Sequence, residues 1–103
     1  MASGRVFSAK DVVLSLPAGV SSSSTANDIC EAAAPGKVYV WSSYAATTYS
    51  PMSKGGNWTY RLTISGGVSA NYTIFEAFYL NDGEYYIYSY AKSKWCKVTT
   101  TAV

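Results

Sequence analysis

Hydrophobic and small polar residues alternate along the second half of the chain, from Asn57 to Thr101. Successive side chains of a β-strand point to opposite faces, so alternation with a period of two is typical of a half-buried strand. A glycine pair at 66–67 and an Asn-Asp-Gly turn at 81–83 interrupt the alternation. The pattern therefore predicts four strands, over residues 57–65, 69–80, 84–90 and 94–101.

The first half of the chain carries a weaker pattern. Residues 5–16 alternate loosely, which predicts one strand or two short ones, and residues 36–42 predict a clear strand. The helical candidate is the segment 28–34, which Pro35-Gly36 stops. Asp28 can cap this helix, and Glu31 completes a capping-box spacing. A helix of this length is stable only when it packs on the sheet.

These elements predict an all-β domain, either a small antiparallel sheet or a compact sandwich, with one short helix. A length of 103 residues suits one domain. Residues 1–24 are expected to form an N-terminal strand segment with a Ser-rich connection, and residues 25–103 the β domain. We expect the core to be built by residues on alternating strand faces, namely Val38, Val40, Leu62, Ile64, Ile74, Phe78 and Ile87.

Composition narrows the class of protein. Charged residues make up 14% of the chain, against roughly 25% in an ordinary domain, and tyrosine occurs ten times. Solubility that comes from hydroxyl groups instead of charges indicates an extracellular or virion-type module. A net charge of +2 is too small to indicate a nucleic-acid partner. No run approaches the roughly 20 apolar residues of a membrane span.

The N-terminus and the two cysteines bear on the compartment. The first residues lead into an amphipathic segment without the apolar stretch of a signal peptide. This favours a virion protein made in the host cytoplasm; the alternative is a secreted protein whose signal has been removed. Cys30 and Cys96 could form one bridge across the domain. Without an export signal, two buried free thiols are favoured over a disulfide.

The chain offers little for catalysis. Histidine is absent, which removes Ser-His-Asp and Cys-His mechanisms and the usual zinc sites. Glu76 and Glu84 are the one carboxylate pair that could flank a glycosidic bond. An ion pair of Glu76 with Arg61 or a lysine, and a place beside a turn for Glu84, are favoured instead. We therefore expect no catalytic residue, no metal and no cofactor.

Aromatic residues give the positive functional signal. Tyr86 and Tyr88 share one face of a strand, and a long polar loop over residues 43–56 carries Tyr44 and Tyr49. Loops of this length are uncommon and often functional, and flat aromatic rings can stack on sugars at low entropic cost. The predicted ligand-binding residues are Tyr44, Tyr49, Trp58, Tyr86 and Tyr88. Alternatively, the same aromatics form cross-strand pairs in the sheet or line a subunit interface.

Four short motifs follow one another along the chain: Asn27-Asp28-Ile29, Pro35-Gly36-Lys37-Val38-Tyr39-Val40, Tyr72-Thr73-Ile74-Phe75-Glu76-Ala77-Phe78 and Lys94-Trp95-Cys96-Lys97. In this order they resemble the knob-type domain of bacteriophage tail fibres and R-type pyocins, over residues 25–101. The chain has Ala34 where that family has Thr, and it keeps only Trp95 of a closing tryptophan pair. The resemblance implies a small β domain on a fibre, often trimeric, that binds cell-surface polysaccharide or positions the receptor-binding tip.

The leading hypothesis is thus a non-enzymatic phage-type virion or tail-fibre module that binds a cell-surface glycan or positions a receptor-binding tip. The alternatives are a structural virion protein, such as a capsid decoration or tail component, and a secreted inhibitor or effector that binds a protein through the loop 43–56. One core of this size cannot hide every aromatic residue, and large exposed apolar patches are rare on monomers. We therefore expect a homo-oligomer, with a trimer favoured, or association with other virion proteins.

Overall fold

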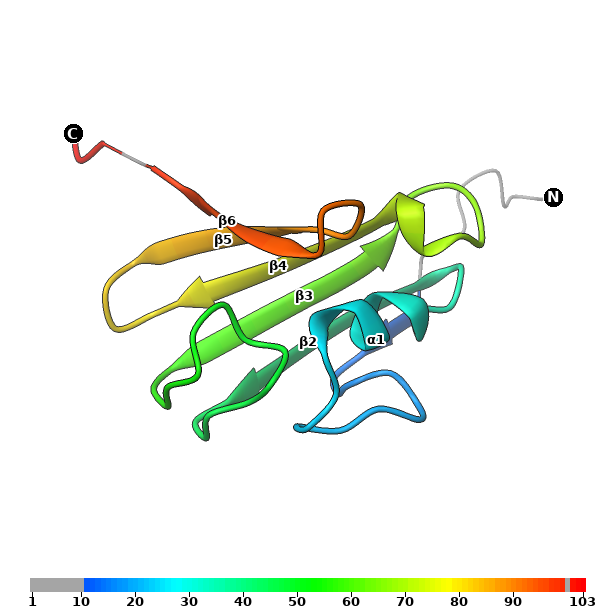
Figure 1. The fold of residues 1–103 in the computed structure, drawn as a ribbon, viewed down its shortest axis with the longest axis horizontal. Helices are drawn as coiled ribbons and strands as arrows, with labels where there is room; N and C mark the ends of the chain where they lie inside the picture. The colour runs from blue at the N-terminus through cyan, green and yellow to red at the C-terminus, as the bar shows by residue number, and fades with distance from the viewer. Residues whose placement is uncertain (1–10, 100) are drawn as a thin grey trace, which may run out of the picture.

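The computed structural model describes residues 11–99 and 101–103. Its strands form one six-stranded sheet in which spatial order follows chain order (Figure 1). The elements are β1 (Asp11–Val13), α1 (Ala26–Glu31), β2 (Lys37–Ser43), β3 (Trp58–Ile64), the 3₁₀ turn η1 (Ala70–Tyr72), β4 (Thr73–Tyr79), β5 (Glu84–Ser89) and β6 (Lys94–Val98). The predicted all-β domain with one short helix is confirmed, as a single sheet and not as a sandwich of two.

The sheet is an antiparallel meander with one exception. Strands β2 to β6 pair antiparallel in succession, and β1 pairs parallel with β2. The tight turn between β4 and β5 forms where the Asn-Asp-Gly sequence predicts it. Gly83 has a φ of +70°, which a residue without a Cβ adopts readily, and its N–H donates to the Tyr79 carbonyl at 2.9 Å. The part of the predicted first strand that falls on residues 5–10 lies outside the described residues.

Helix α1 begins earlier than the sequence predicts. The Thr25 hydroxyl accepts a hydrogen bond from the Asp28 N–H, and the Asp28 carboxylate accepts one from the Thr25 N–H, both at 3.1 Å. Thr25 is therefore the N-cap of the helix, and Asp28 is its N3 residue and not the cap. The predicted range 28–34 is wrong at both ends, because the helix runs from Ala26 to Glu31. The segment contains two overlapping capping signals, Thr25 with Asp28 and Asp28 with Glu31, and the helix uses the first. This helix is not long and apolar enough to span a membrane, and no other helix in the described part of the chain is.

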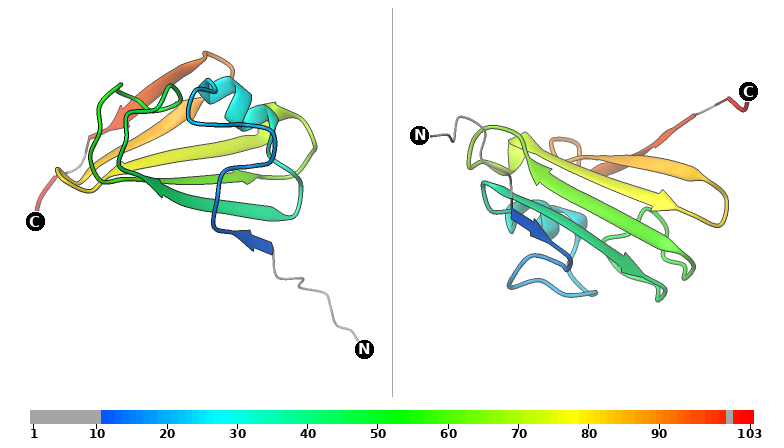
Figure 2. Two further views of the ribbon diagram at one scale, coloured as in Figure 1. Left: turned by 90° about the horizontal axis from the view of Figure 1, so that it is seen from below. Right: turned by 180° about the vertical axis from the view of Figure 1, so that it is seen from behind.

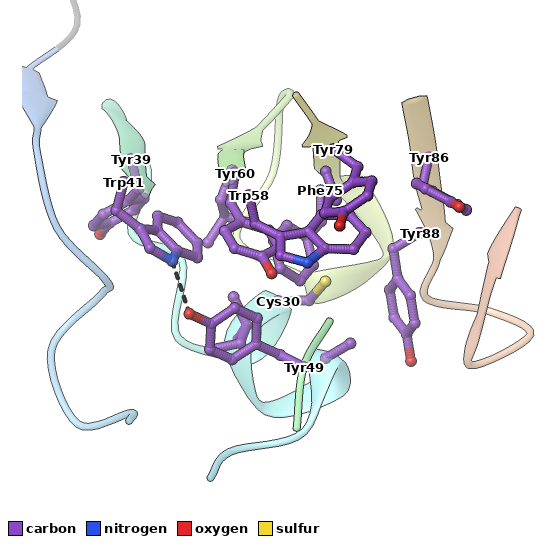
Figure 3. Packing of buried hydrophobic residues seen from close by; sticks show 14 residues of the cluster. Cys30, Tyr39, Trp41, Tyr49, Trp58, Tyr60, Phe75, Tyr79, Tyr86 and Tyr88 are labelled. Atoms are coloured by element: carbon purple, nitrogen blue, oxygen red, sulfur yellow. Dashed lines mark hydrogen bonds between the residues drawn. The ribbon is translucent and has the colours of Figure 1, made fainter. Parts of the chain in front are cut away.

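The two faces of the sheet are covered unequally (Figure 2). Helix α1 and the loop between β2 and β3 lie against the same face, which we call the covered face, and the opposite face is the uncovered face. The core lies between the sheet and this cover, and most of its large side chains are aromatic (Figure 3). The strand residues of the core are Tyr39, Trp41, Trp58, Tyr60, Leu62, Phe75, Ala77, Tyr79, Tyr86 and Tyr88, and the cover adds Ala26, Ile29, Cys30 and Tyr49.

The predicted core was assigned in part to the wrong face. Leu62 and Ile64 are buried on the covered face. Ile74 and Ile87 point to the uncovered face and are 43% and 39% exposed. Val38, Val40 and Phe78 lie on that same face and are partly buried. Alternation separates the two faces of a strand, but it does not say which face is covered when both are apolar.

Candidate functional site

Tyr49 lies in the loop between β2 and β3 and closes over the middle of the covered face (Figure 3). Its side chain is 1% exposed. The Tyr49 hydroxyl accepts a hydrogen bond from Trp41 Nε1 at 3.0 Å, and its backbone carbonyl accepts one from Trp95 Nε1 at 2.9 Å. Tyr49 therefore anchors the loop to β2 and β6 and offers no free ring face to a ligand.

The other predicted strand aromatics, Trp58, Tyr86 and Tyr88, also lie on the covered face and are buried. The Tyr88 hydroxyl donates to Asn27 Oδ1 on α1 at 2.6 Å, which ties the helix to β5. Tyr49, Tyr86 and Tyr88 therefore present no exposed ring to a ligand, whereas Trp58, although buried, also lines the pocket described below. The helix and the loop shield them, and their rings stabilise the sheet through aromatic pairs such as Trp58 with Tyr79, whose centroids are 4.6 Å apart.

Tyr86 occupies the end of this buried row. Its hydroxyl donates to Glu84 Oε1 at 2.7 Å, and Lys97 Nζ donates to Glu84 Oε2 at 2.8 Å. Burial, together with the bond to Glu84, raises the pKa of Tyr86 to about 12. The phenol therefore stays protonated and serves as a structural donor.

Tyr44 is the one predicted ligand-binding residue that the structure leaves exposed, with 74% of its surface accessible. It borders a shallow pocket of about 140 Å³ at the end of the sheet where β2 ends and β3 begins. The pocket is lined by Ser42, Ser43, Tyr44, Asn57, Trp58, Thr59 and Leu80. We call this the Tyr44 pocket. It combines an exposed aromatic ring with the hydroxyl groups of neighbouring strands.

The backbone around the Tyr44 pocket is held firmly while the ring of Tyr44 is free. The Tyr44 carbonyl accepts a hydrogen bond from the Gly56 N–H at 2.9 Å. A Cβ on Gly55 would lie 2.7 Å from this same carbonyl oxygen, so the loop can approach only with glycine there. Across the pocket, the Asn57 N–H donates to Asn81 Oδ1 at 2.8 Å.

The polar lining of the Tyr44 pocket includes side chains that the sequence did not single out. Ser42 Oγ and Thr59 Oγ1 lie 3.1 Å apart across the β2–β3 pair. Each of these hydroxyls can offer a further hydrogen bond to a ligand. Serine and threonine are frequent throughout this chain, so only the strand register, which places Ser42 opposite Thr59, distinguishes this pair.

The uncovered face carries an ion pair near its centre. Arg61 Nε and Nη2 donate to the two carboxylate oxygens of Glu76 at 2.6 and 2.9 Å, and the Tyr85 hydroxyl donates to Glu76 Oε2 at 2.5 Å. Burial alone would raise the pKa of Glu76, but the hydrogen bonds from Arg61 and Tyr85 and the Arg61 charge outweigh it and leave that pKa lowered. The predicted pairing of Glu76 with Arg61 is confirmed.

Glu76 and Glu84 cannot act together on one sugar. Glu76 pairs across the sheet with Ile87 on the uncovered face, whereas Glu84 pairs with Tyr79 on the covered face. The two carboxyl groups thus lie on opposite sides of the sheet, and a glycosidase needs them to face each other across one bond. In residues 11–99 and 101–103, no three His, Cys, Asp or Glu side chains gather as metal ligands.

The two cysteines are free and lie in different surroundings. Cys30 on α1 is buried against the sheet, and burial raises the pKa of its thiol to about 11. Cys96 pairs across β5–β6 with Ile87 on the uncovered face and is exposed. The prediction of free thiols is confirmed, but the expectation that both are buried is wrong for Cys96, because β6 is an edge strand whose outer face no described residue covers.

Comparison of the chain with protein-family models, with curated proteins and with solved structures yields no match. The resemblance to tail-fibre knob domains therefore stays a prediction from sequence motifs. Function is inferred below from the Tyr44 pocket and from the contrast between the two faces of the sheet.

Proposed function

We propose that the chain is a non-enzymatic, phage-type virion or tail-fibre module that binds a cell-surface glycan in the Tyr44 pocket. The observation that carries this proposal is the exposed ring of Tyr44 beside a pocket lined with hydroxyl groups. An aromatic ring can stack on the apolar face of a sugar, and neighbouring Ser, Thr and Asn side chains supply adaptable hydrogen bonds.

The dimensions of the pocket favour a small epitope. A volume of about 140 Å³ accommodates part of one sugar ring, such as the terminal residue of a chain. A site of this size binds weakly when alone. Several copies on one particle would raise the avidity, because each linked site benefits from the effective concentration set by the others.

Replacement of Tyr44 by Ser tests this function. Wild-type protein and Tyr44→Ser are compared for binding to an array of bacterial surface polysaccharides, and the bound sugar protons are mapped by saturation-transfer NMR. We expect the Tyr44→Ser variant to bind at least about ten-fold more weakly, which corresponds to about 1.4 kcal/mol. The melting temperature should not change, because the ring of Tyr44 is exposed.

Tyr72→Ser provides the matched control. Tyr72 is also an exposed tyrosine, 54% accessible, but it lies in η1 and does not line the Tyr44 pocket. It should bind the array as the wild type does. Equal binding by the wild type and Tyr44→Ser, or no binding by any of the three proteins, would remove the basis for the glycan-binding function.

A structural virion protein is the second candidate function. The observation that favours it is the uncovered face of the sheet, which is apolar over several strands and is suited to contact with protein. The two functions share part of one surface, because Ser42 and Thr59 of the Tyr44 pocket lie at the end of the uncovered face, beside Phe78.

A further inference from the structure

The uncovered face is unusually apolar for a face that contacts water. An antiparallel sheet with one solvated face normally carries polar residues there, and β3 follows this rule with Thr59, Arg61 and Thr63. The strands on both sides of β3 are more apolar on this face. Their outward residues include Ser42, Glu76, Ser89 and Lys94, but the majority are apolar: Val12 on β1, Val38 and Val40 on β2, Ile74 and Phe78 on β4, Tyr85 and Ile87 on β5, and Cys96 and Val98 on β6.

No described segment of the chain covers this face. Helix α1 and the loop between β2 and β3 both lie on the opposite side of the sheet (Figure 2). The ring of Phe78 stacks on Tyr85 with centroids 4.9 Å apart, and the Arg61 guanidinium lies 5.8 Å from the Phe78 ring centroid. The uncovered face is thus an ordered, packed layer of side chains whose outer surface has no partner within the described chain.

Charge does not oppose contact at the centres of two such faces, and Lys94 on the edge strand β6 adds one positive charge at the margin. Both carboxylate oxygens of Glu76 are bonded by Arg61, and Tyr85 adds a third hydrogen bond. The pair is neutral as a unit and already satisfied, so that like faces would not repel each other at their centres. The face therefore does not require a partner of strong opposite charge.

Size and twist also suit a second copy of the same sheet. Strands β2, β3 and β4 have seven residues each, which span about 23 Å, and the footprint of the sheet is on the order of 500 Å². Two such faces would bury on the order of 1,000 Å² in total, which is the lower bound for a specific interface. Two sheets of the same twist pack face to face with their strands about 30° apart, and a second copy supplies that twist.

We propose that the uncovered face is an interface in which it packs against the same face of another copy of this chain. The resulting particle contains a second sheet layer that the single chain lacks. Ser42 and Thr59 of the Tyr44 pocket also point to the uncovered face, but Ile74, Ile87 and Cys96 do not line that pocket, so association through them is tested separately from glycan binding.

The double variant Ile74→Lys/Ile87→Lys tests the interface. Both isoleucines are partly exposed in the single chain, so lysine can reach solvent there, whereas an interface would bury two unpaired charges. Sedimentation velocity from low to high micromolar concentration should give a dimer for the wild type, because a face that packs against the same face of a second copy closes with two chains. The double variant should dissociate at least about a hundred-fold more readily. Val68→Lys is the matched control, since Val68 is 84% exposed in the turn after β3 and off this face.

Thiol labelling of the wild type gives a second test that needs no substitution. Cys96 lies on the uncovered face, whereas Cys30 is buried beneath the cover. Labelling of Cys96 should slow at least about ten-fold as the chain concentration rises through the association range. A wild type that remains a single chain at high micromolar concentration overturns the proposal. So does an oligomer that the double variant leaves intact, or one in which the labelling rate of Cys96 is independent of concentration.

Discussion

The covered and the uncovered faces of the sheet both carry apolar residues, yet they differ in what packs against them. On the covered face, Tyr49 and the helix residues Ile29 and Cys30 complete a closed aromatic core. On the uncovered face, Ile74 and Ile87 remain open to solvent in the single chain. The same alternation along β4 and β5 therefore supplies an internal core on one side and, on the other, the partly exposed face that we propose as an interface.

This difference shows that the role of the aromatic residues depends on the loop and the helix as much as on the strands. Tyr86 and Tyr88 would be an exposed ladder if α1 and the loop were absent. With the cover present, the hydrogen bonds of Tyr88 to Asn27 and of Tyr49 to Trp41 hold the helix and the loop against the sheet, and the tyrosines become part of the core. Of the predicted ligand-binding residues, Tyr44, at the margin of the cover, is the one that stays exposed.

The largest expected effect comes from a cavity beneath the cover. Phe75→Ala should lower the free energy of unfolding by about 3–5 kcal/mol, because Phe75 is fully buried among aromatic rings. Ile87→Ala, one strand away on the uncovered face, should cost about 1 kcal/mol in the dissociated chain. Urea unfolding at low concentration measures both. Equal losses would mean that the two faces are equally buried.

A second, smaller effect should come from the ion pair on the uncovered face. Glu76→Gln should cost about 1–3 kcal/mol at neutral pH, because it weakens charged hydrogen bonds from Arg61. The pKa of Glu76 is lower in the folded than in the unfolded chain, where it is about 4.3. Its stabilisation is therefore complete above that pH and is lost as the pH falls through the folded value.

Unfolding free energies measured from neutral to acid pH check this prediction. The difference between wild type and Glu76→Gln should shrink on acidification. Glu84→Gln is the control on the covered side, where the pairing with Lys97 is more exposed, and it should cost less. A difference between wild type and Glu76→Gln that does not vary with pH would show that the carboxylate charge is unimportant.

The stability of the cover itself can be probed at its first residue. Thr25→Ala removes the hydroxyl that accepts the Asp28 N–H and should cost about 1 kcal/mol. Thr25→Ser keeps that acceptor and should cost less. Amide hydrogen exchange should localise the change to α1 and leave β3 and β4 protected. Loss of protection throughout the sheet would show instead that the helix and the sheet unfold as one unit.

The reactivity of the two cysteine thiols compares the exposure of the two faces without a substitution that alters stability. In the folded, dissociated chain, Cys96 should react with a thiol reagent at once, whereas Cys30 should react only after unfolding. Cys30 is buried, and its raised pKa of about 11 keeps it from forming the reactive thiolate. Mass spectrometry after a short exposure should find one label per chain, on Cys96. Rapid labelling of Cys30 would indicate that α1 opens readily.

Much of the fold could be predicted from the sequence because most of its pairings are local. The alternation in 57–65 and 84–90 and the glycine at position 83 suffice for the meander of β3, β4 and β5. The parallel pairing of β1 with β2 could not be predicted, because it joins two segments across the helix and depends on the path of the intervening chain.

The candidate site was less accessible to prediction. Tyr44 and Tyr49 lie in the same polar loop and look alike in sequence, yet one is exposed and the other is 1% accessible. Tyr49 is buried because its hydroxyl and its carbonyl accept hydrogen bonds from Trp41 and Trp95, which lie on two different strands. These contacts depend on the folded sheet, and the local sequence around the two tyrosines carries no signal for them.

The ion pair of Arg61 and Glu76 also bears on how the chain chooses its alignment while folding. The two residues are direct cross-strand neighbours in the β3–β4 hairpin, whose connection is long enough to permit sliding. A slip of one residue would turn every β4 side chain over and drive Glu76 into the aromatic core. A slip of two would keep Glu76 outward but separate it from Arg61. The pair therefore favours the observed register of β3 and β4, because both slips break it. Apolar neighbours such as Ile74 and Phe78 are interchangeable in a slipped sheet and would not by themselves disfavour either slip.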